Sequence, residues 1–145
     1  MSTHLKIAVV GLSQTGKSSL VARFLAKDFA ASNYLATETC LFEDVVSTIV
    51  DGTVLSATIM DTPGREDDLD SLPKWFNWAE AIIVVYSINL KHSFEVVKKY
   101  CQSLHTLSQE STKQFKTPIF LVGAKEDLDR HFKRLVSVEA GTQLA

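Results

Sequence analysis

The stretch Gly11-Leu12-Ser13-Gln14-Thr15-Gly16-Lys17-Ser18 decides the fold of this chain. It fits the pattern GxxxxGK[ST], in which glycines let the backbone curl around phosphate groups. The apolar run Leu5–Val10 precedes it and predicts a buried strand, while Ser18–Lys27 has apolar side chains at helical spacing. A strand, a glycine-rich turn and a helix in this order are the context that supports the pattern. We therefore expect a phosphate-binding loop, with Lys17 on the outer phosphates and Ser18 on Mg²⁺.

Further strands and helices alternate along the rest of the chain. Buried strands are predicted at Ala81–Ile88 and Pro118–Val122, and β-rich runs at Cys40–Val50 and Thr53–Met60 flank the hairpin dipeptide Asp51-Gly52. Alternation of this kind predicts an α/β fold with a mostly parallel, doubly wound sheet and one antiparallel edge strand.

The predicted helices cover Trp75–Ala79, Ser93–Leu107 with Ser93 as its N-cap, and a last segment from Val138 with Ser137 as its N-cap. Polar loops are predicted at 61–73 and 123–133. We expect Trp75 and Trp78 to make core contacts, with a partner surface as the alternative.

The composition is that of one globular domain, residues 1–145. Lys plus Arg is 15, Asp plus Glu is 17, the formal net charge is −2, and 46% of the residues are hydrophobic. These values exclude a disordered chain, a collagen-like chain and a long coiled coil, and the near-neutral balance predicts no nucleic-acid partner. The longest purely apolar run, Ala81–Tyr86, is far shorter than the ~20 residues of a membrane helix.

The cysteines and histidines form no metal-binding or redox pattern. Cys40 and Cys101 lack a CxxC spacing, so we expect two reduced thiols in a cytoplasmic protein, with one disulfide as the alternative. The four histidines do not have zinc-site spacing. Ser2 stands where N-myristoylation requires glycine, and no cysteine lies near the end, so this form is predicted to carry no lipid anchor.

Two more loops follow predicted strands and should converge with the phosphate loop, because ligands of such sheets bind beyond the carboxyl ends of the strands. Asp61-Thr62-Pro63-Gly64 places a carboxylate where it suits Mg²⁺ through water, and Gly64 lets its backbone N–H approach a phosphate. In the loop Gly123–Asp127, the Asp127 carboxylate can accept two N–H bonds from a guanine edge, and the Lys125 stem can cover the base.

Together these residues resemble the Ras superfamily of small GTPases, a P-loop NTPase family. The segments GKSSLVARFLAKDF, DTPGRED and LVGAKEDLD are similar to the branch of the Ras-related estrogen-regulated growth inhibitor. The resemblance implies a signalling switch that binds GTP or GDP with Mg²⁺ and meets protein effectors and regulators through its switch loops. It implies Ser18, Thr37 and, through water, Asp61 as metal ligands, with Thr39 as the weaker alternative to Thr37. The implied nucleotide-binding residues are Gly11, Leu12, Ser13, Gln14, Thr15, Gly16, Lys17, Ser18, Ser19, Phe29, Thr37, Asp61, Gly64, Ala124, Lys125 and Asp127.

Three substitutions depart from the family pattern. Arg65 stands where the family has the glutamine that orients the attacking water, and Ser13 stands where Ras keeps a glycine. Arginine cannot accept a hydrogen bond, so we expect slow GTP hydrolysis and assign no catalytic residue. Ala124 replaces the asparagine that bonds the base, which lowers affinity by up to about tenfold.

The end of the sequence also departs from the family, which adds one more strand and one more helix. We expect a C-terminally truncated domain with an exposed sheet face and poor nucleotide retention. A degenerate GTPase that acts as a non-hydrolysing binding module is the alternative function. A small P-loop kinase is disfavoured because Lys125 and Asp127 are suited to recognise guanine.

Overall fold

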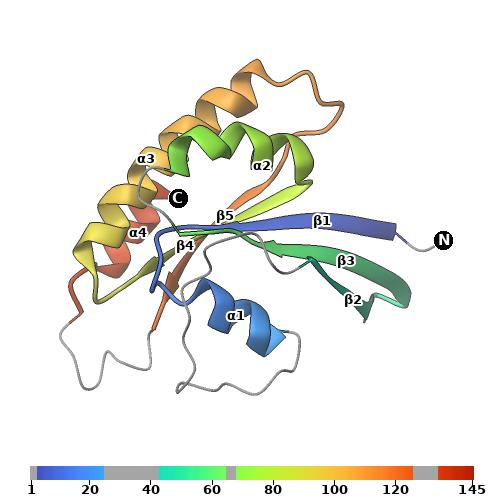
Figure 1. Ribbon diagram of the computed structural model, residues 1–145, viewed down its shortest axis with the longest axis horizontal. Helices are drawn as coiled ribbons and strands as arrows, with labels where there is room; N and C mark the ends of the chain where they lie inside the picture. The colour runs from blue at the N-terminus through green and yellow to red at the C-terminus, as the bar shows by residue number, and fades with distance from the viewer. Residues whose placement is uncertain (1–2, 25–42, 65–67, 126–133) are drawn as a thin grey trace.

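The computed structural model describes residues 3–24, 43–64, 68–125 and 134–145 (Figure 1). Its sheet has five strands in the order β2-β3-β1-β4-β5, of which β1, β3, β4 and β5 run parallel and β2 runs antiparallel to β3. The strands are β1 (Thr3–Val10), β2 (Glu43–Val50), β3 (Thr53–Asp61), β4 (Ala81–Ser87) and β5 (Ile119–Ala124). The predicted α/β class, with one antiparallel edge strand, is confirmed.

Helices cover both faces of the sheet. In the view of Figure 1, α1 lies below the sheet, and α2, α3 and α4 lie above it. The helical elements are α1 (Lys17–Phe24), a short 3₁₀ helix η2 (Asp68–Ser71), α2 (Leu72–Trp78), α3 (Lys91–Glu110) and α4 (Val138–Leu144). Within the described residues, no helix is long and apolar enough to cross a membrane.

The core consists of two apolar layers, one on each face of the sheet. Successive strand side chains point to opposite faces, so alternate residues of β1 and β4 serve different layers. The smaller layer, under α1, contains Val9, Val21, Ile59 and Val85. The larger layer, under α2 and α3, contains Ala8, Ile82, Val84, Phe76, Val97 and Leu104. Burial on both faces explains the apolar end of β1, Ile7–Val10, and the nearly continuous apolar run of β4.

The Asp51-Gly52 dipeptide forms the predicted hairpin between β2 and β3. Both residues have positive φ, 48° for Asp51 and 77° for Gly52, as a two-residue turn of this hand requires. The turn sets the register Val50↔Thr53, from which the rest of the ladder follows. Cys101 has a free thiol, and Cys40 lies outside the described residues.

Two local predictions were wrong. The segment 61–73 was predicted to be a loop throughout, but η2 occupies 68–71, and α2 begins at Leu72 with Pro73 in its first turn, where the missing N–H costs nothing. Ser93 was predicted as an N-cap, but α3 begins at Lys91 with Leu90 as the N-cap. The Ser93 hydroxyl instead accepts a bond from the Ser87 N–H (2.9 Å), so it joins the helix to the end of β4. The predicted Ser137 cap is confirmed, since its hydroxyl accepts a bond from the Ala140 N–H at 3.1 Å.

The hairpin turn generates a stability prediction. Replacing Gly52 by Ala should destabilise the protein by about 1 kcal/mol, because the left-handed backbone conformation of Gly52 is unfavourable for a residue with a Cβ. No atom lies within 4 Å of the added Cβ, so the effect is one of backbone conformation and not of a clash. Urea unfolding measures it. Gly52→Asn is the control, because asparagine tolerates positive φ, and an equal loss in both variants would contradict the explanation.

Candidate functional site

The phosphate loop connects β1 to α1 and lies close against β4. Gly11 has φ of 147°, and a Cβ there would lie 2.2 Å from the carbonyl oxygen of Val85, so only glycine fits. The carbonyl oxygen of Leu12 accepts hydrogen bonds from the Thr15 hydroxyl (2.7 Å) and the Lys17 ammonium (2.9 Å). Lys17 is 5% exposed, so its charge is held inside the curl of the loop. An enclosed ammonium beside a curled backbone at the start of a helix is an arrangement that suits phosphate.

Asp61, at the end of β3, meets Ser18 at the start of α1. The Ser18 hydroxyl donates to Oδ2 of Asp61, and the other carboxylate oxygen, Oδ1, is buried with no hydrogen-bond partner in the described part of the chain. Burial raises the pKa of the Asp61 carboxyl, although the Ser18 hydrogen bond and the Lys17 charge act in the opposite direction. A buried carboxylate oxygen without a donor is costly, and a cation relieves that cost.

The donor set fits Mg²⁺. A hydroxyl and a carboxylate are hard oxygen ligands, and Mg²⁺ completes its shell with water and substrate phosphates and needs few protein ligands. The described residues contain no group of three or more His, Cys, Asp or Glu side chains that could hold a metal ion. Ser18 and Asp61 are therefore suited to hold the ion.

The segment after Asp61 lies directly on the phosphate loop. The Ser13 N–H donates to the carbonyl oxygen of Gly64 at 2.7 Å, and a Cβ at Gly64 would lie 2.2 Å from the Ser13 nitrogen. The Thr62 hydroxyl donates to the carbonyl oxygen of Val9 at 2.7 Å, which fixes the segment to the end of β1. Gly64 is thus required because two backbones meet here, a reason that the sequence pattern alone did not supply.

The end of β5 joins the same site. The Lys125 ammonium donates to the carbonyl oxygen of Gln14 at 2.6 Å, so the predicted base loop and the phosphate loop are connected. The Ala124 methyl carbon lies 3.6 Å from where a Cβ on Gly16 would be. Gln14 and Lys125 have backbone φ angles of 63° and 70°, in the left-handed region that residues other than glycine uncommonly adopt. The three predicted loops therefore converge at one edge of the sheet.

Comparisons with known proteins agree with this geometry. The model of the Ras family matches residues 6–145. The chain belongs to the Ras family. It is 36% identical over 148 residues to Ras-like protein family member 11A of Mus musculus and 37% identical over 150 residues to Ras-like protein family member 11B of Xenopus laevis. These alignments cover 97% and 99% of this chain and 57% of each relative.

The predicted branch is also supported. The human Ras-related and estrogen-regulated growth inhibitor is 35% identical over 144 residues, which cover 99% of this chain and 67% of that relative. The chain thus falls in the branch of the Ras family that contains these growth-inhibitor and Ras-like members. It spans little more than half the length of the first relatives it matches.

Several residues assigned from the Ras family pattern lie outside the described part of the chain. They are Phe29, Thr37 and its alternative Thr39, Arg65 and Asp127. The described site contains the phosphate loop, Ser19 in α1, Asp61, Gly64, Ala124 and Lys125. Trp75 is 6% exposed and belongs to the core layer under α2, with Trp78 packed against that layer, as the core interpretation predicted.

Lys113 is a residue of this Ras-family fold that sequence reasoning missed. Its ammonium donates to the carbonyl oxygens of Phe76 and Ala79 (2.8 Å for Ala79) and to the Thr117 hydroxyl (3.0 Å), and it lies 4.5 Å from the centre of the Phe76 ring. Burial lowers the pKa of the Lys113 ammonium. These bonds satisfy carbonyls at the C-terminal end of α2, the helix that follows the Asp61–Gly64 loop. The lysine and its acceptors in α2 are far apart in the sequence, so no local pattern identifies the contact.

Removing the Lys113 ammonium should destabilise the protein. Lys113→Met keeps the apolar stem but leaves two carbonyls at the end of α2 without their donor, so we expect a loss of about 1–3 kcal/mol in urea unfolding. Lys116→Met, at an exposed lysine of the same connection, is the matched control and should stay within about 0.5 kcal/mol of the unmodified protein. Similar losses in both variants would show that the α2 contacts contribute nothing.

Asp61 generates a prediction for metal and for pH. Because burial raises the pKa of Asp61 in the folded protein, ionisation of this carboxyl destabilises the fold. Its contribution to the free energy of unfolding therefore falls as the pH rises through the raised pKa. Without nucleotide and Mg²⁺, the stability of Asp61→Asn relative to the unmodified protein should therefore increase as the pH rises from the ordinary carboxyl pKa through the raised pKa of Asp61. The same variant should lose the increase in nucleotide affinity that Mg²⁺ produces.

Asp70→Asn, at an exposed residue of η2, is the control for both measurements. Urea midpoints measured across the pH range and calorimetry with and without Mg²⁺ provide the data. A difference between Asp61→Asn and the unmodified protein that stays constant with pH, or an unchanged Mg²⁺ effect, would contradict the assignment.

Proposed function

We propose that this chain is a guanine-nucleotide switch that binds GTP or GDP with Mg²⁺ and hydrolyses GTP slowly. The observation that carries the proposal is the buried Oδ1 of Asp61, which has no hydrogen-bond partner among the described residues and lies beside the Ser18 hydroxyl and the Lys17 ammonium. A carboxylate and a hydroxyl for a hard cation, next to a buried cation for phosphate, are the parts that bind a magnesium nucleotide. Family membership supports the nucleotide class, since the Ras family model covers residues 6–145.

Each part of the site has a chemical task. Backbone N–H groups of the phosphate loop and the start of α1 offer partial positive charge to phosphate oxygens. The Lys17 ammonium, now on the Leu12 carbonyl, exchanges this weak acceptor for anionic phosphate oxygens. Ser18 and, through water, Asp61 would hold Mg²⁺, with Thr37 as the further ligand implied by the family. When bound, Mg²⁺ neutralises the negative charge of the phosphates.

Recognition of the base is assigned to Lys125 and Asp127. The Lys125 bond to Gln14 supports this assignment, because it holds the start of the base loop against the phosphate loop. Ala124 offers a methyl group in place of a side-chain amide, so the base loses one hydrogen bond, at a cost of up to about tenfold in affinity. Guanine selectivity then depends on the carboxylate of Asp127.

Slow hydrolysis follows from two side chains. Arg65 cannot accept a hydrogen bond from the attacking water, so the general positioning role of the family glutamine is lost. Ser13 adds a side chain at the point where the backbones of the phosphate loop and the Gly64 segment are already in contact. Protein effectors and regulators that contact the switch loops, and a cytoplasmic location, complete the proposal and rest on family resemblance.

Nucleotide binding is tested by calorimetry with GTP, GDP and ATP in the presence of Mg²⁺. We expect GTP and GDP to bind and ATP to bind at least about a hundredfold more weakly, because adenine lacks the donor pair that Asp127 accepts. Lys17→Ala should abolish binding, while Lys98→Ala, at a half-exposed lysine of α3, should not. Tight ATP binding would favour a kinase, and absence of all binding would favour a binding module.

The hydrolysis rate is tested in single turnover beside a Ras reference protein. We expect slower turnover than the reference, and Arg65→Gln should raise the rate because glutamine can orient water. Turnover equal to or faster than the reference would contradict this part of the proposal, and no turnover in either variant would favour the non-hydrolysing alternative.

A further inference from the structure

One carbonyl oxygen of the phosphate loop accepts hydrogen bonds from two side chains. The Leu12 carbonyl accepts the Thr15 hydroxyl at 2.7 Å and the Lys17 ammonium at 2.9 Å. We propose that Thr15 is a positioning residue for nucleotide binding, because its hydroxyl keeps the Leu12 carbonyl bonded when Lys17 turns to the phosphates. The inference rests on the proposed function, in which Lys17 binds the outer phosphates of the nucleotide.

Thr15 lies inside the curl of the loop. The residue is 0% exposed, so water does not compete for its hydroxyl. The hydroxyl donates to the carbonyl three residues earlier, and this local bond closes the turn between Leu12 and Thr15. Both neighbours of Thr15 have positive φ, 63° for Gln14 and 96° for Gly16. Because few residues other than glycine adopt such angles, a bond inside the curl helps to maintain its shape.

A hydroxyl at this position is a property of this chain and not of the phosphate-loop motif. The pattern GxxxxGK[ST] leaves residue 15 open, since Thr15 occupies the last of its four variable positions. An apolar residue of the same shape would satisfy the motif equally well. The side-chain bond to Leu12 therefore adds a contact that the motif does not require.

Phosphate binding changes what the Leu12 carbonyl receives. The Lys17 ammonium has three N–H donors, and anionic phosphate oxygens attract it more strongly than a neutral carbonyl does. As Lys17 turns toward phosphate, its bond to Leu12 weakens, and a carbonyl that loses its donor raises the free energy of the complex. The Thr15 hydroxyl stays on the Leu12 carbonyl and removes that penalty.

The empty protein and the complex should therefore respond differently to loss of the hydroxyl. In the empty loop, Lys17 still donates to the Leu12 carbonyl at 2.9 Å, so the fold keeps one of the two bonds. In the complex, Lys17 is engaged with phosphate and the carbonyl depends on Thr15. The loss is then larger for nucleotide binding than for folding, which distinguishes a positioning residue from one that only supports the fold.

The first test is calorimetry with GDP and Mg²⁺. Thr15→Val removes the hydroxyl but keeps the shape, and it should weaken GDP binding by about three- to tenfold. Thr15→Ser keeps a hydroxyl and should stay within about twofold of the unmodified protein. Thr106→Val is the matched control, because the Thr106 hydroxyl also donates to a main-chain carbonyl, that of Gln102 at 3.2 Å, but in α3.

Three results of this test would overturn the inference. They are unchanged GDP affinity in Thr15→Val, equally weak binding in Thr15→Ser and Thr15→Val, and failure of Thr15→Val to fold. The last result would show that the hydroxyl is needed by the empty protein, in which Lys17 was expected to be sufficient.

The second test is urea unfolding without nucleotide, applied to Thr15→Val, Lys17→Met and the double variant. Each single variant leaves one of the two donors on Leu12, and the double variant removes both. The unfolding constant of the double variant should exceed the product of the two single changes by about three- to tenfold. Independent effects, with no excess over that product, would overturn the inference. If Lys17→Met fails to fold, the GDP comparison between Thr15→Val and Thr15→Ser decides.

The two tests also separate the inference from the proposed function. Absence of GDP binding to the unmodified protein would reject the proposed function. Normal GDP binding without an effect of Thr15→Val, or without coupling to Lys17→Met, would reject only the role of Thr15.

Discussion

The architecture depends on the central position of β1. This strand pairs with β3 on one side and β4 on the other, and both pairings are parallel. Parallel pairing brings the carboxyl ends of all these strands to one edge of the sheet, where the chain must turn. At that edge, the phosphate loop approaches β4 so closely that a Cβ on Gly11 would lie 2.2 Å from a carbonyl oxygen. Every polar contact of the site is a consequence of this convergence.

The same convergence makes a buried polar cluster tolerable. Asp61, Lys17 and Ser18 are brought out of bulk water together, with a hydrogen bond for one carboxylate oxygen and none in the described residues for the other. Such a cluster is not an efficient way to stabilise a fold, because desolvation opposes the attraction between the groups. Its arrangement has a chemical rationale under the proposed function: one carboxylate oxygen lacks a hydrogen-bond partner among the described residues, and the Lys17 ammonium lies on a neutral carbonyl oxygen that an anion could replace.

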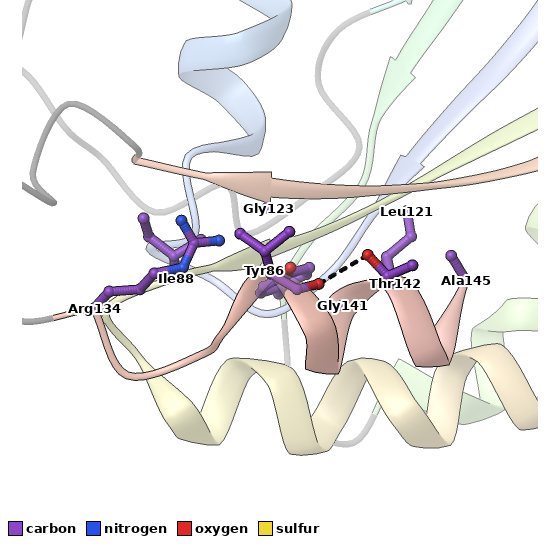
Figure 2. Close-up of a pocket in the computed structure, with 9 residues that line it drawn as sticks. Tyr86, Ile88, Leu121, Gly123, Arg134, Gly141, Thr142 and Ala145 are labelled. Carbon is purple, nitrogen blue, oxygen red and sulfur yellow. Dashed lines mark hydrogen bonds between the residues drawn. The ribbon is translucent and has the colours of Figure 1, made fainter.

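On the face of the sheet that carries α2, α3 and α4, the contacts between distant segments involve main-chain carbonyls and glycines. Lys113 holds the end of α2 through main-chain carbonyls, and the Tyr86 hydroxyl lies between Gly123 of β5 and Gly141 of α4 (Figure 2). β5 leads directly to Lys125, which donates to the Gln14 carbonyl oxygen of the phosphate loop.

The sequence by itself determined the class of the fold, the order of its elements and the three loops of the site. Apolar periodicity, the glycine-rich loop and the Asp51-Gly52 turn are local signals, and each acts over a few residues. It also assigned Ser18 and Asp61 to one predicted Mg²⁺ site, because each belongs to a motif that follows a predicted strand, but the hydrogen bond between them came from the structure. The helical turns at 68–73 were not predicted, because the run of carboxylates and turn residues favours a loop. The burial of Leu72 and Phe76 in the core favours the helix instead. Ser93 was misassigned as an N-cap because its hydroxyl accepts a bond from the N–H of Ser87, six residues earlier at the end of β4.

Only the tertiary structure decided which backbone groups meet. The reason Gly64 must be glycine, the bond of Lys125 to Gln14, the Lys113 contacts with α2 and the pair of glycines around Tyr86 all join segments that are far apart in the chain. Sequence patterns carry information about neighbours within a helix turn or a strand pair, whereas these contacts depend on how complete elements pack.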